Sequence, residues 1–346
     1  MDLLDARQRG NGEYVMSGPV KRYILLKFPQ RDCDLSCSYC YLNRRKRVGT
    51  DAFFRQYPPE KIAAALAPER IGGTAFFYAY SDGEPLLHNE NLALLSHLTE
   101  RGHFAAVTTN LNCVDPASAA ARFSPEARGR MLFFASLHYL ELRRRNRLAL
   151  FFDTLHQLRE VGFSLRIRLC LAPEYLPWIK EIDAMCLDRA GQLPLLTRWR
   201  DGSGKKNDMS TLDRIGERSP VYRLQRRCAD QKRTEFCLAG KKSCLLDLET
   251  GEFHACVTER ACGHLGTDVG NAVQQLPDSP VGRNCSAGWC MCCSHLLPWG
   301  VIPELYPGSY AELFFSDCPN SLSPELLDVL SRRHCNEYSD PDKELK

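Results

Sequence analysis

Short apolar runs alternate with longer amphipathic segments through the first 200 residues of the chain. The apolar runs have the length of strands and predict six of them, at Arg22–Phe28, Thr74–Tyr80, Phe104–Thr109, Met131–His138, Ser164–Leu171 and Leu193–Trp199. The amphipathic segments predict five helices, at Pro59–Ala67, Asn89–Arg101, Pro116–Arg128, Arg145–Val161 and Tyr175–Ala190. This alternation is typical of an α/β fold with a parallel sheet, and six strands fit a partial barrel or an open sheet equally well.

The composition changes after residue 200. Asp201–Asp208 is polar and contains glycine, which predicts a linker, and Thr211–Arg227 is a weak helix candidate interrupted at Pro220. From residue 228 onward, short cysteine-bearing pieces have too few apolar repeats for a core of their own, so metal binding would supply folding energy. We therefore expect three parts: an α/β domain over 1–200, a linker and helix over 201–227, and a small cysteine-rich domain over 228–346.

Overall composition narrows the class of protein. Apolar residues make up 44% of the 346 residues and charged residues 25%, as in ordinary globular proteins. Lys and Arg number 45 against 42 Asp and Glu, and this net charge of +3 gives no support to a nucleic-acid partner. No apolar run approaches 18 residues and no export signal precedes the first strand, so we expect no membrane partner and a cytoplasmic location.

Cysteine is the exception to this ordinary composition. The chain has 17 cysteines, six before residue 228 and eleven from there on. In a reducing compartment so many thiols indicate metal binding rather than disulfides. The distribution predicts two separate metal regions.

The first metal region is a trio of cysteines directly after the first predicted strand. Cys33, Cys37 and Cys40 have the spacing C-x3-C-x2-C, at the strand end where ligands of α/β folds bind. Three thiolates are one short of the four that enclose a [4Fe-4S] cluster, so one iron would keep an open coordination position. The alternatives are a zinc site, completed by His88, His103 or His138, and three incidental thiols that bind no metal.

The segment CDLSCSYC resembles the signature of the radical S-adenosylmethionine (SAM) superfamily, with Tyr39 at the aromatic position. The resemblance implies a partial (β/α)6 barrel in which SAM binds the open iron of the [4Fe-4S] cluster. It also implies that one electron, from a donor such as flavodoxin or ferredoxin, splits SAM into a 5′-deoxyadenosyl radical. This radical abstracts a hydrogen atom from the substrate.

Other positions fit the same resemblance and supply candidate SAM contacts. Gly83 and Glu84 lie in YSDGEPLL, which is similar to the family's GGEP segment for the SAM amine, although Asp82 replaces the first glycine. Ser136 corresponds to the hydroxyl that contacts the ribose. Arg166 and Arg168 share one face of a strand, where related enzymes place a basic residue near the SAM carboxylate. The alternatives are an ordinary turn at residues 83–84 and structural salt bridges for the arginines, and no catalytic residue is identified, since His138 is as well explained by packing.

The tail resembles the SPASM extension of many radical SAM enzymes, which holds auxiliary [4Fe-4S] clusters. Cys237, a glycine 14 positions later and Cys256 match its opening, and LLDLETGEFHA between them predicts a hairpin that brings the two thiols together. The resemblance adds Cys228 as an extra ligand and Cys290 with Cys293 as the C-x2-C pair. The second half departs from the pattern, so one or two auxiliary clusters are expected, the second drawing on Cys318 and Cys335. A zinc module is the alternative.

Together these features predict a radical SAM enzyme, an oxidoreductase or peptide-modifying enzyme. We favour a peptide or protein substrate that is crosslinked, epimerised or oxidised at a side chain. The alternative is a dehydrogenase or epimerase for a sugar, nucleoside or other small metabolite. A rival of another class is a non-catalytic zinc-binding interaction protein. The basic runs Asn43–Arg47 and Glu141–Arg147 are interpreted as solvated faces, or as attractants for an acidic peptide or phosphorylated substrate.

Overall fold

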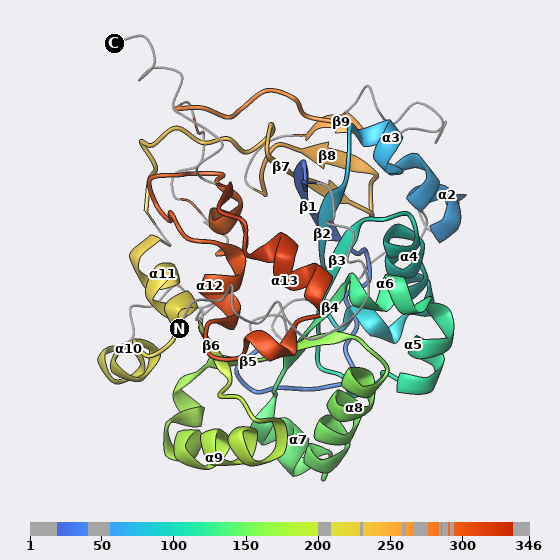
Figure 1. The fold of residues 1–346 in the computed structure, drawn as a ribbon. Coiled ribbons are helices and arrows are strands. Elements are labelled where there is room, and N and C mark those ends of the chain that lie inside the picture. Colours follow the sequence, from blue (N-terminus) through green and yellow to red (C-terminus); the bar gives the residue numbers. More distant parts are fainter. Residues whose placement is uncertain are drawn as a thin grey trace.

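The computed structural model describes residues 19–40, 56–199, 209–228, 231–257, 261–265, 276–283, 285, 290 and 294–334. The described strands form one sheet of nine strands in the order β6-β5-β4-β3-β2-β1-β7-β8-β9 (Figure 1). Their bounds are β1 Arg22–Lys27, β2 Ala75–Tyr80, β3 Phe104–Thr109, β4 Met131–Ser136, β5 Ser164–Leu171, β6 Leu195–Arg198, β7 Ser243–Asp247, β8 Glu252–His254 and β9 Ala261–His264.

Strands β1 to β6 pair in parallel with their neighbours in chain order, which confirms the six predicted strands and the parallel α/β class. Leu25 lies opposite Tyr78 in this register, and Val107 lies opposite Phe133. All six carboxyl ends therefore lie along one edge of the sheet, where the loops of the candidate site are found.

Helices connect the parallel strands, as predicted. Their bounds are α2 Pro59–Ala65, α3 Pro68–Ile71, α4 Asn89–Glu100, α5 Pro116–Arg122, α6 Pro125–Gly129, α7 Tyr139–Arg144, α8 Leu148–Glu160, α9 Ile179–Ala190, α10 Ser210–Gly216 and α11 Pro220–Cys228. Short 3-10 turns lie at Pro85–Leu87 and Pro173–Trp178. The single helix expected over Pro116–Arg128 is divided into α5 and α6. The second helix begins after Ser124, an N-cap residue whose side chain accepts a hydrogen bond from the backbone N–H of Ala127. The break at Pro220 falls where it is predicted.

Alternate residues of the strands enter two different cores. Phe133 and Ala135 belong to the core shared with the connecting helices. Leu132 and Phe134 belong to a second core on the opposite face of the sheet. Side chains thus alternate between the two faces along β4, and Phe134 faces away from the helices.

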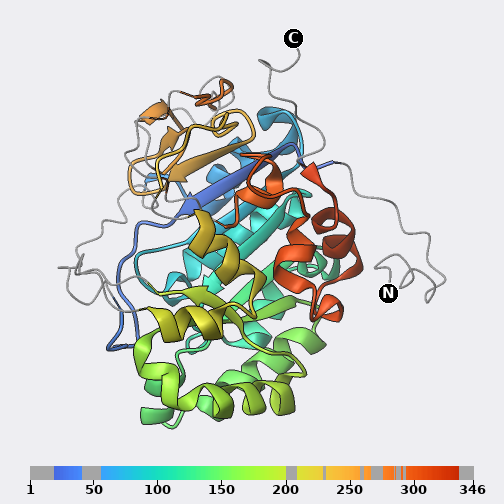
Figure 2. The same cartoon turned by 90° about the vertical axis from the view of Figure 1, so that its left-hand side faces the viewer.

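The C-terminal segment covers that second face. It carries η6 Leu297–Trp299, α12 Tyr310–Phe315, η7 Pro319–Ser321 and α13 Pro324–Leu330. Its aromatic rings pack on strand residues, with Trp299 at 5.2 Å from Phe76 and Phe314 at 5.6 Å from Phe134 between ring centroids. Figures 1 and 2 show this red segment lying along one side of the strands. Residues 294–334 therefore gain their core from the sheet, which explains why they have little apolar pattern of their own.

The cysteine-rich tail also continues the sheet. Strand β7 pairs in parallel with β1, and β8 returns antiparallel to β7 through a turn in which Gly251 has a φ of 78°. The predicted hairpin is thus confirmed. Strand β7 satisfies the backbone groups that β1 would otherwise expose at a sheet edge, so this part of the tail shares one sheet with the first six strands. Within the described ranges no helix is both long and apolar enough to cross a membrane.

Candidate active site

The three cysteines of the trio all lie in the loop that follows β1. The backbone N–H of Cys40 donates to the carbonyl of Cys37 at 3.1 Å, which folds the loop into a turn. Burial, and then the neighbouring thiolates of Cys33 and Cys40, raise the pKa of Cys37 to about 12. A set of thiols that repel one another's charge suits a positively charged metal centre, which stabilises thiolates.

Asp34, between the first two cysteines, fixes the loop to β3 and to the end of α7. Its carboxylate accepts a hydrogen bond from Asn110 Nδ2 at 2.7 Å and another from the side-chain amide of Asn112. Its carbonyl oxygen accepts from Arg145 Nη1 at 2.7 Å. The loop is thus held by polar groups of the polypeptide on both sides.

Glu141 on α7 makes a second anchor for this loop. Its buried carboxylate accepts from the backbone N–H of Ser36 at 3.2 Å and from Arg145 Nε at 2.6 Å, while Arg144 supplies two further donors. The hydrogen bonds from Arg144, then Ser36 and Arg145, lower the pKa of Glu141 to about 2. Sequence reasoning missed this role, although Glu-x2-Arg-Arg right after a strand has the i,i+3 and i,i+4 spacing that supports such pairs.

The loop after β2 packs directly on the trio loop. A Cβ on Gly83 would collide with the carbonyl oxygen of Asp32, so only glycine allows this approach. The backbone N–H of Glu84 donates to the same carbonyl at 2.8 Å. The structure therefore gives Gly83 a close-approach role beside the trio; its contact with SAM remains a prediction.

The Glu84 side chain is buried and ties the ends of β2 and β3 together. Its carboxylate accepts from Thr109 Oγ1 and from the backbone N–H of Asn110, both at 2.7 Å, and from the N–H of Leu86 at 3.0 Å. Burial raises its pKa to about 7, and the hydrogen bonds oppose this shift. The predicted contact with the SAM amine would have to share these oxygens.

His138 is the one of the three candidate histidines that the structure places against the trio. Its Nδ1 lies 2.5 Å from the Tyr39 hydroxyl and 3.3 Å from Cys37 Sγ. Burial lowers its pKa to about 4, so the imidazole is neutral. His88 instead contacts Asp32, and His103 bridges the backbone of Ala75 in β2 and of Leu66 at the end of α2. In the described part of the chain, no three His, Cys, Asp or Glu side chains form a group suited to a single metal ion.

The two arginines of β5 have different surroundings. Arg168 lies opposite Ser136 in the register of β4 and β5, and its Nη1 donates to Tyr78 Oη at 2.8 Å and Thr108 Oγ1 at 2.9 Å. Arg166 is 2% exposed and bound to the C-terminal segment, with Nη2 at 2.9 Å from Asp317.

The Nη1 of Arg166 also donates to Cys318 Sγ at 2.9 Å, so its donors are directed away from the trio edge. The expectation that Arg166 contacts SAM is therefore corrected: the salt-bridge alternative describes this residue. Ser136 and Arg168 remain together as candidates. Cys318, which is expected to take part in a second auxiliary cluster, accepts a hydrogen bond from this arginine.

A second group of thiols gathers in the tail. Burial, followed by the charges of Cys256, Cys290 and Cys285, raises the pKa of Cys237 to about 12. Backbone bridges draw the two halves of the tail together, from Cys290 N to the Gln231 carbonyl at 2.8 Å and from Cys237 N to the Gly282 carbonyl at 3.2 Å. Cys256, Cys285 and Cys290 thus lie near enough to Cys237 for their charges to act on it, and Cys285 is a residue that the ligand set based on C-x2-C spacing leaves out.

The other predicted tail ligands have different outcomes. Cys228 ends α11 and is 1% exposed within the apolar core on the second face of the sheet. Cys293 and Cys335 lie outside the described residues, as do the linker Asp201–Asp208 and the basic run Asn43–Arg47.

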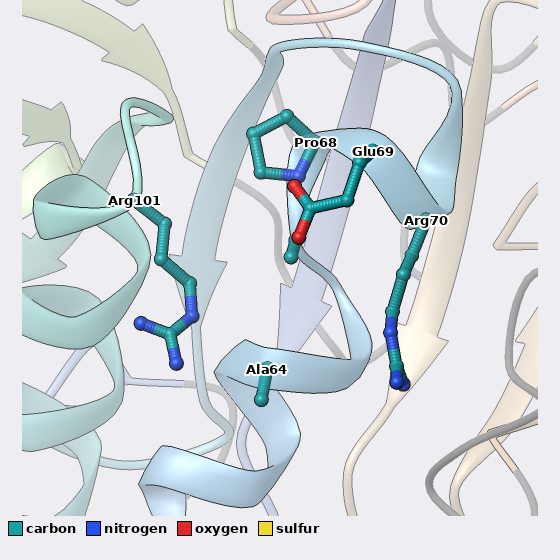
Figure 3. A pocket seen from close by; sticks show the side chains of 6 residues that line it. Ala64, Pro68, Glu69, Arg70 and Arg101 are labelled. Carbon is teal, nitrogen blue, oxygen red and sulfur yellow. The ribbon is translucent and has the colours of Figure 1, made fainter.

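Cavities in the described surface include one at the outer helix layer and one beside the trio loop. The larger, about 410 Å³, lies at the outer helix layer, where Arg70 and Arg101 stand on either side of Pro68 and Glu69 (Figure 3). These residues precede β2 and β3, so the cavity lies at the edge opposite the trio. A cavity of about 190 Å³ adjoins the trio loop and is lined by Ser36, Cys37, Ser38, Tyr39, Leu140, Glu141 and Arg144.

Comparison with known proteins gives a likeness of fold. No protein-family model and no curated protein matches the sequence. Among solved structures, a histidine-tagged form of anSMEcpe with bound AdoMet matches with a TM-score of 0.51 at 12% identity, over 91% of both chains. Streptococcus suis SuiB bound to S-adenosylmethionine has a TM-score of 0.49 at 19% identity, over 71% of this chain and 63% of its own.

The chain thus spans less than two thirds of the length of SuiB. The likeness to the AdoMet-bound anSMEcpe structure is one of fold, a mixed α/β architecture whose sheet in this chain is mainly parallel. At these identities the likeness concerns the fold, and the activity is argued from the site.

Proposed function

We propose that this protein is a radical SAM enzyme in which Cys33, Cys37 and Cys40 hold a [4Fe-4S] cluster. The observation that carries the proposal is the C-x3-C-x2-C spacing of these cysteines in the one loop that follows β1, at the carboxyl edge of the parallel sheet. Three thiolates leave one iron of the cluster open for SAM. When bound, the cluster and SAM supply a one-electron cleavage to a 5′-deoxyadenosyl radical, which takes a hydrogen atom from the substrate.

The polypeptide's share in this chemistry is to fix the loop and to shape the SAM pocket. Asp34 and Glu141 hold the loop, and Gly83 lets the β2 loop approach it. We assign the SAM contacts to Tyr39, the Gly83–Glu84 segment, Ser136 and Arg168. Arg168 suits a carboxylate, because its guanidinium lies on the strand face that turns away from the helices.

We assign one auxiliary [4Fe-4S] cluster to Cys237, Cys256, Cys285 and Cys290. Four thiols close the coordination of such a cluster, so this centre would have no open iron. Cys228 and Cys293 stay candidate ligands on the strength of the SPASM resemblance alone, and a second auxiliary cluster that uses Cys318 would need Arg166 to give up its hydrogen bond.

For the substrate we favour a peptide or protein, because the tail resembles an extension found mostly on peptide-modifying members of the family. A small-metabolite dehydrogenase or epimerase is the alternative within the class. The reaction also needs a one-electron donor such as flavodoxin or ferredoxin.

The test uses anaerobically purified protein that is loaded with iron and sulfide and reduced with dithionite. Added SAM should yield 5′-deoxyadenosine, and a Cys37→Ala variant should yield none. Cys186→Ala is the matched control, because Cys186 is a buried thiol of α9 outside the trio, and this variant should keep the activity. A colourless protein with stoichiometric zinc, or full cleavage by the Cys37 variant, would show that the proposal is wrong.

A further inference from the structure

The outer side of the trio loop is bordered by a concentrated positive charge. Residues 139–147, which include α7, carry four arginines and one glutamate, and this net +3 equals the formal charge of the whole chain. Three of the arginines are exposed, namely Arg143, Arg144 and Arg147. The fourth, Arg145, is turned inward to Asp34 and Glu141. The rest of the chain has no net formal charge, so this surface is a candidate for attracting an acidic partner, although Arg143 also pairs with Glu181 at 3.7 Å.

A cavity opens in this surface and reaches a residue of the trio. The 190 Å³ cavity is lined by both Cys37 and Arg144, and the Arg144 side chain is 64% exposed. Its α7 wall belongs to the helix side of the sheet, because Tyr139 and Leu142 pack in that core. Ser136 and Arg168, two of our SAM candidates, lie at the other face of the strands, whereas Tyr39, another candidate, lines the cavity. The cavity is therefore an approach to Cys37 from the helix side of the sheet, away from the strand face that carries Ser136 and Arg168.

Two of the exposed arginines are held in place by neighbouring side chains. The Arg143 guanidinium lies 4.2 Å from the centroid of the Trp178 ring and donates to the Tyr139 hydroxyl at 3.0 Å. Arg144 is fixed by Glu141, the anchor of the trio loop. Positioned charges around a cavity favour recognition of a protein surface, because little side-chain freedom is lost on binding.

We propose that Arg143, Arg144 and Arg147, with the cavity at Cys37, form the docking surface for an acidic protein that donates one electron. This inference rests on the proposed function and names the place where the reductant binds. One electron leaves the donor, which is oxidised by one equivalent, and the [4Fe-4S] centre is reduced by one equivalent. No atom is transferred. The position next to Cys37 is what favours a redox partner over an acidic peptide substrate, since electron transfer requires close approach.

The decisive variant is Arg147→Glu, because Arg147 is exposed and lies outside the loop anchors. Its matched control is Arg189→Glu, an equal change of charge at an exposed arginine in the last turn of α9. Arg189 lies at the end of α9 that leads to the start of β6. The 12 residues of this helix span about 18 Å, which separates Arg189 from the carboxyl edge of the sheet. SAM cleavage is measured with two reductants, dithionite and a reduced flavodoxin, which is an acidic protein with a one-electron flavin.

We expect Arg147→Glu to slow flavodoxin-driven cleavage roughly tenfold at low salt, since steering charges change association rates by that order. Dithionite-driven cleavage should stay unchanged, Arg189→Glu should leave both rates unchanged, and added salt should slow only the flavodoxin reaction of the wild type. Equal flavodoxin rates in both variants would overturn the proposal. So would an equal loss with both reductants, or a defect confined to peptide turnover, which would indicate a substrate surface. Failure of the proposed function itself is distinguishable, because the wild type would then be inactive with dithionite too.

Discussion

The trio loop and the tail thiols are built by different means. The trio loop is tied by side chains from three neighbouring regions, at Asp34 through Asn110, at Ser36 through Glu141, and at Ser38 through Glu174 at 2.7 Å. The thiols around Cys237 are drawn together through backbone bridges at Gly282 and Gln231 and through the short β7–β8 hairpin. For the two proposed metal regions we therefore expect that the polypeptide prepares the trio loop before metal binds, and that the tail depends more on the metal for its folding energy.

The largest expected difference between the trio loop and the tail thiols appears when one thiol is removed from each region. Fully loaded protein should hold about eight irons, and Cys37→Ala and Cys285→Ala should each lose about four. Only Cys37→Ala should abolish cleavage of SAM, because only the trio leaves an iron open. Iron and sulfide analysis beside a 5′-deoxyadenosine assay measures both effects. Equal loss of cleavage in the two variants would remove the distinction between the regions.

Removal of metal gives the next largest difference. In the metal-free protein, backbone amides of the described tail around residues 237–257 should exchange with solvent at least about tenfold faster than in the loaded protein. Amides of residues 33–40 should change less, because Asp34 and Glu141 still hold that loop. Hydrogen-exchange mass spectrometry compares the two forms. A larger change in the trio loop than in the tail would reverse the comparison.

A smaller effect is expected from Glu141→Ala, which removes the anchor at Ser36. It should destabilise the protein by about 2 kcal/mol, as expected for hydrogen bonds to a buried charge, and raise the SAM concentration needed for half-maximal cleavage. Asp317→Asn is the control: it weakens the pair with Arg166 and should cost about 1 kcal/mol, because Asp317 is half exposed. Its SAM dependence should match the wild type. The same SAM dependence in both variants would mean that Glu141 does not position the loop.

The first six strands follow from the sequence because alternation of apolar residues sets both the strand and the face, as at Phe133 and Phe134. The trio is predicted by its spacing and by its place at a strand end. The pairing of β7 with β1 could not be predicted from either segment. Backbone hydrogen bonds form this pair, and many other apolar strands could form the same bonds with β1.

The packing of residues 294–334 on the sheet, and the residues that hold the trio loop, could also not be predicted from the sequence. Helices α12 and α13 have six and seven residues, too short for a clear period, and their apolar side chains are explained only by the sheet face they cover. The run that contains Glu141 and Arg145 has the composition of a solvated face, yet these two residues bind the trio loop. Charge patterns alone do not show which partners lie nearby in space.

Electron paramagnetic resonance of the reduced, iron-loaded protein tests the central claim most directly. A [4Fe-4S] centre with one open iron should give a signal that shifts when SAM is added. Cys285→Ala should keep this shift, and Cys37→Ala should lose it. A wild-type spectrum that stays identical with and without SAM would contradict the account.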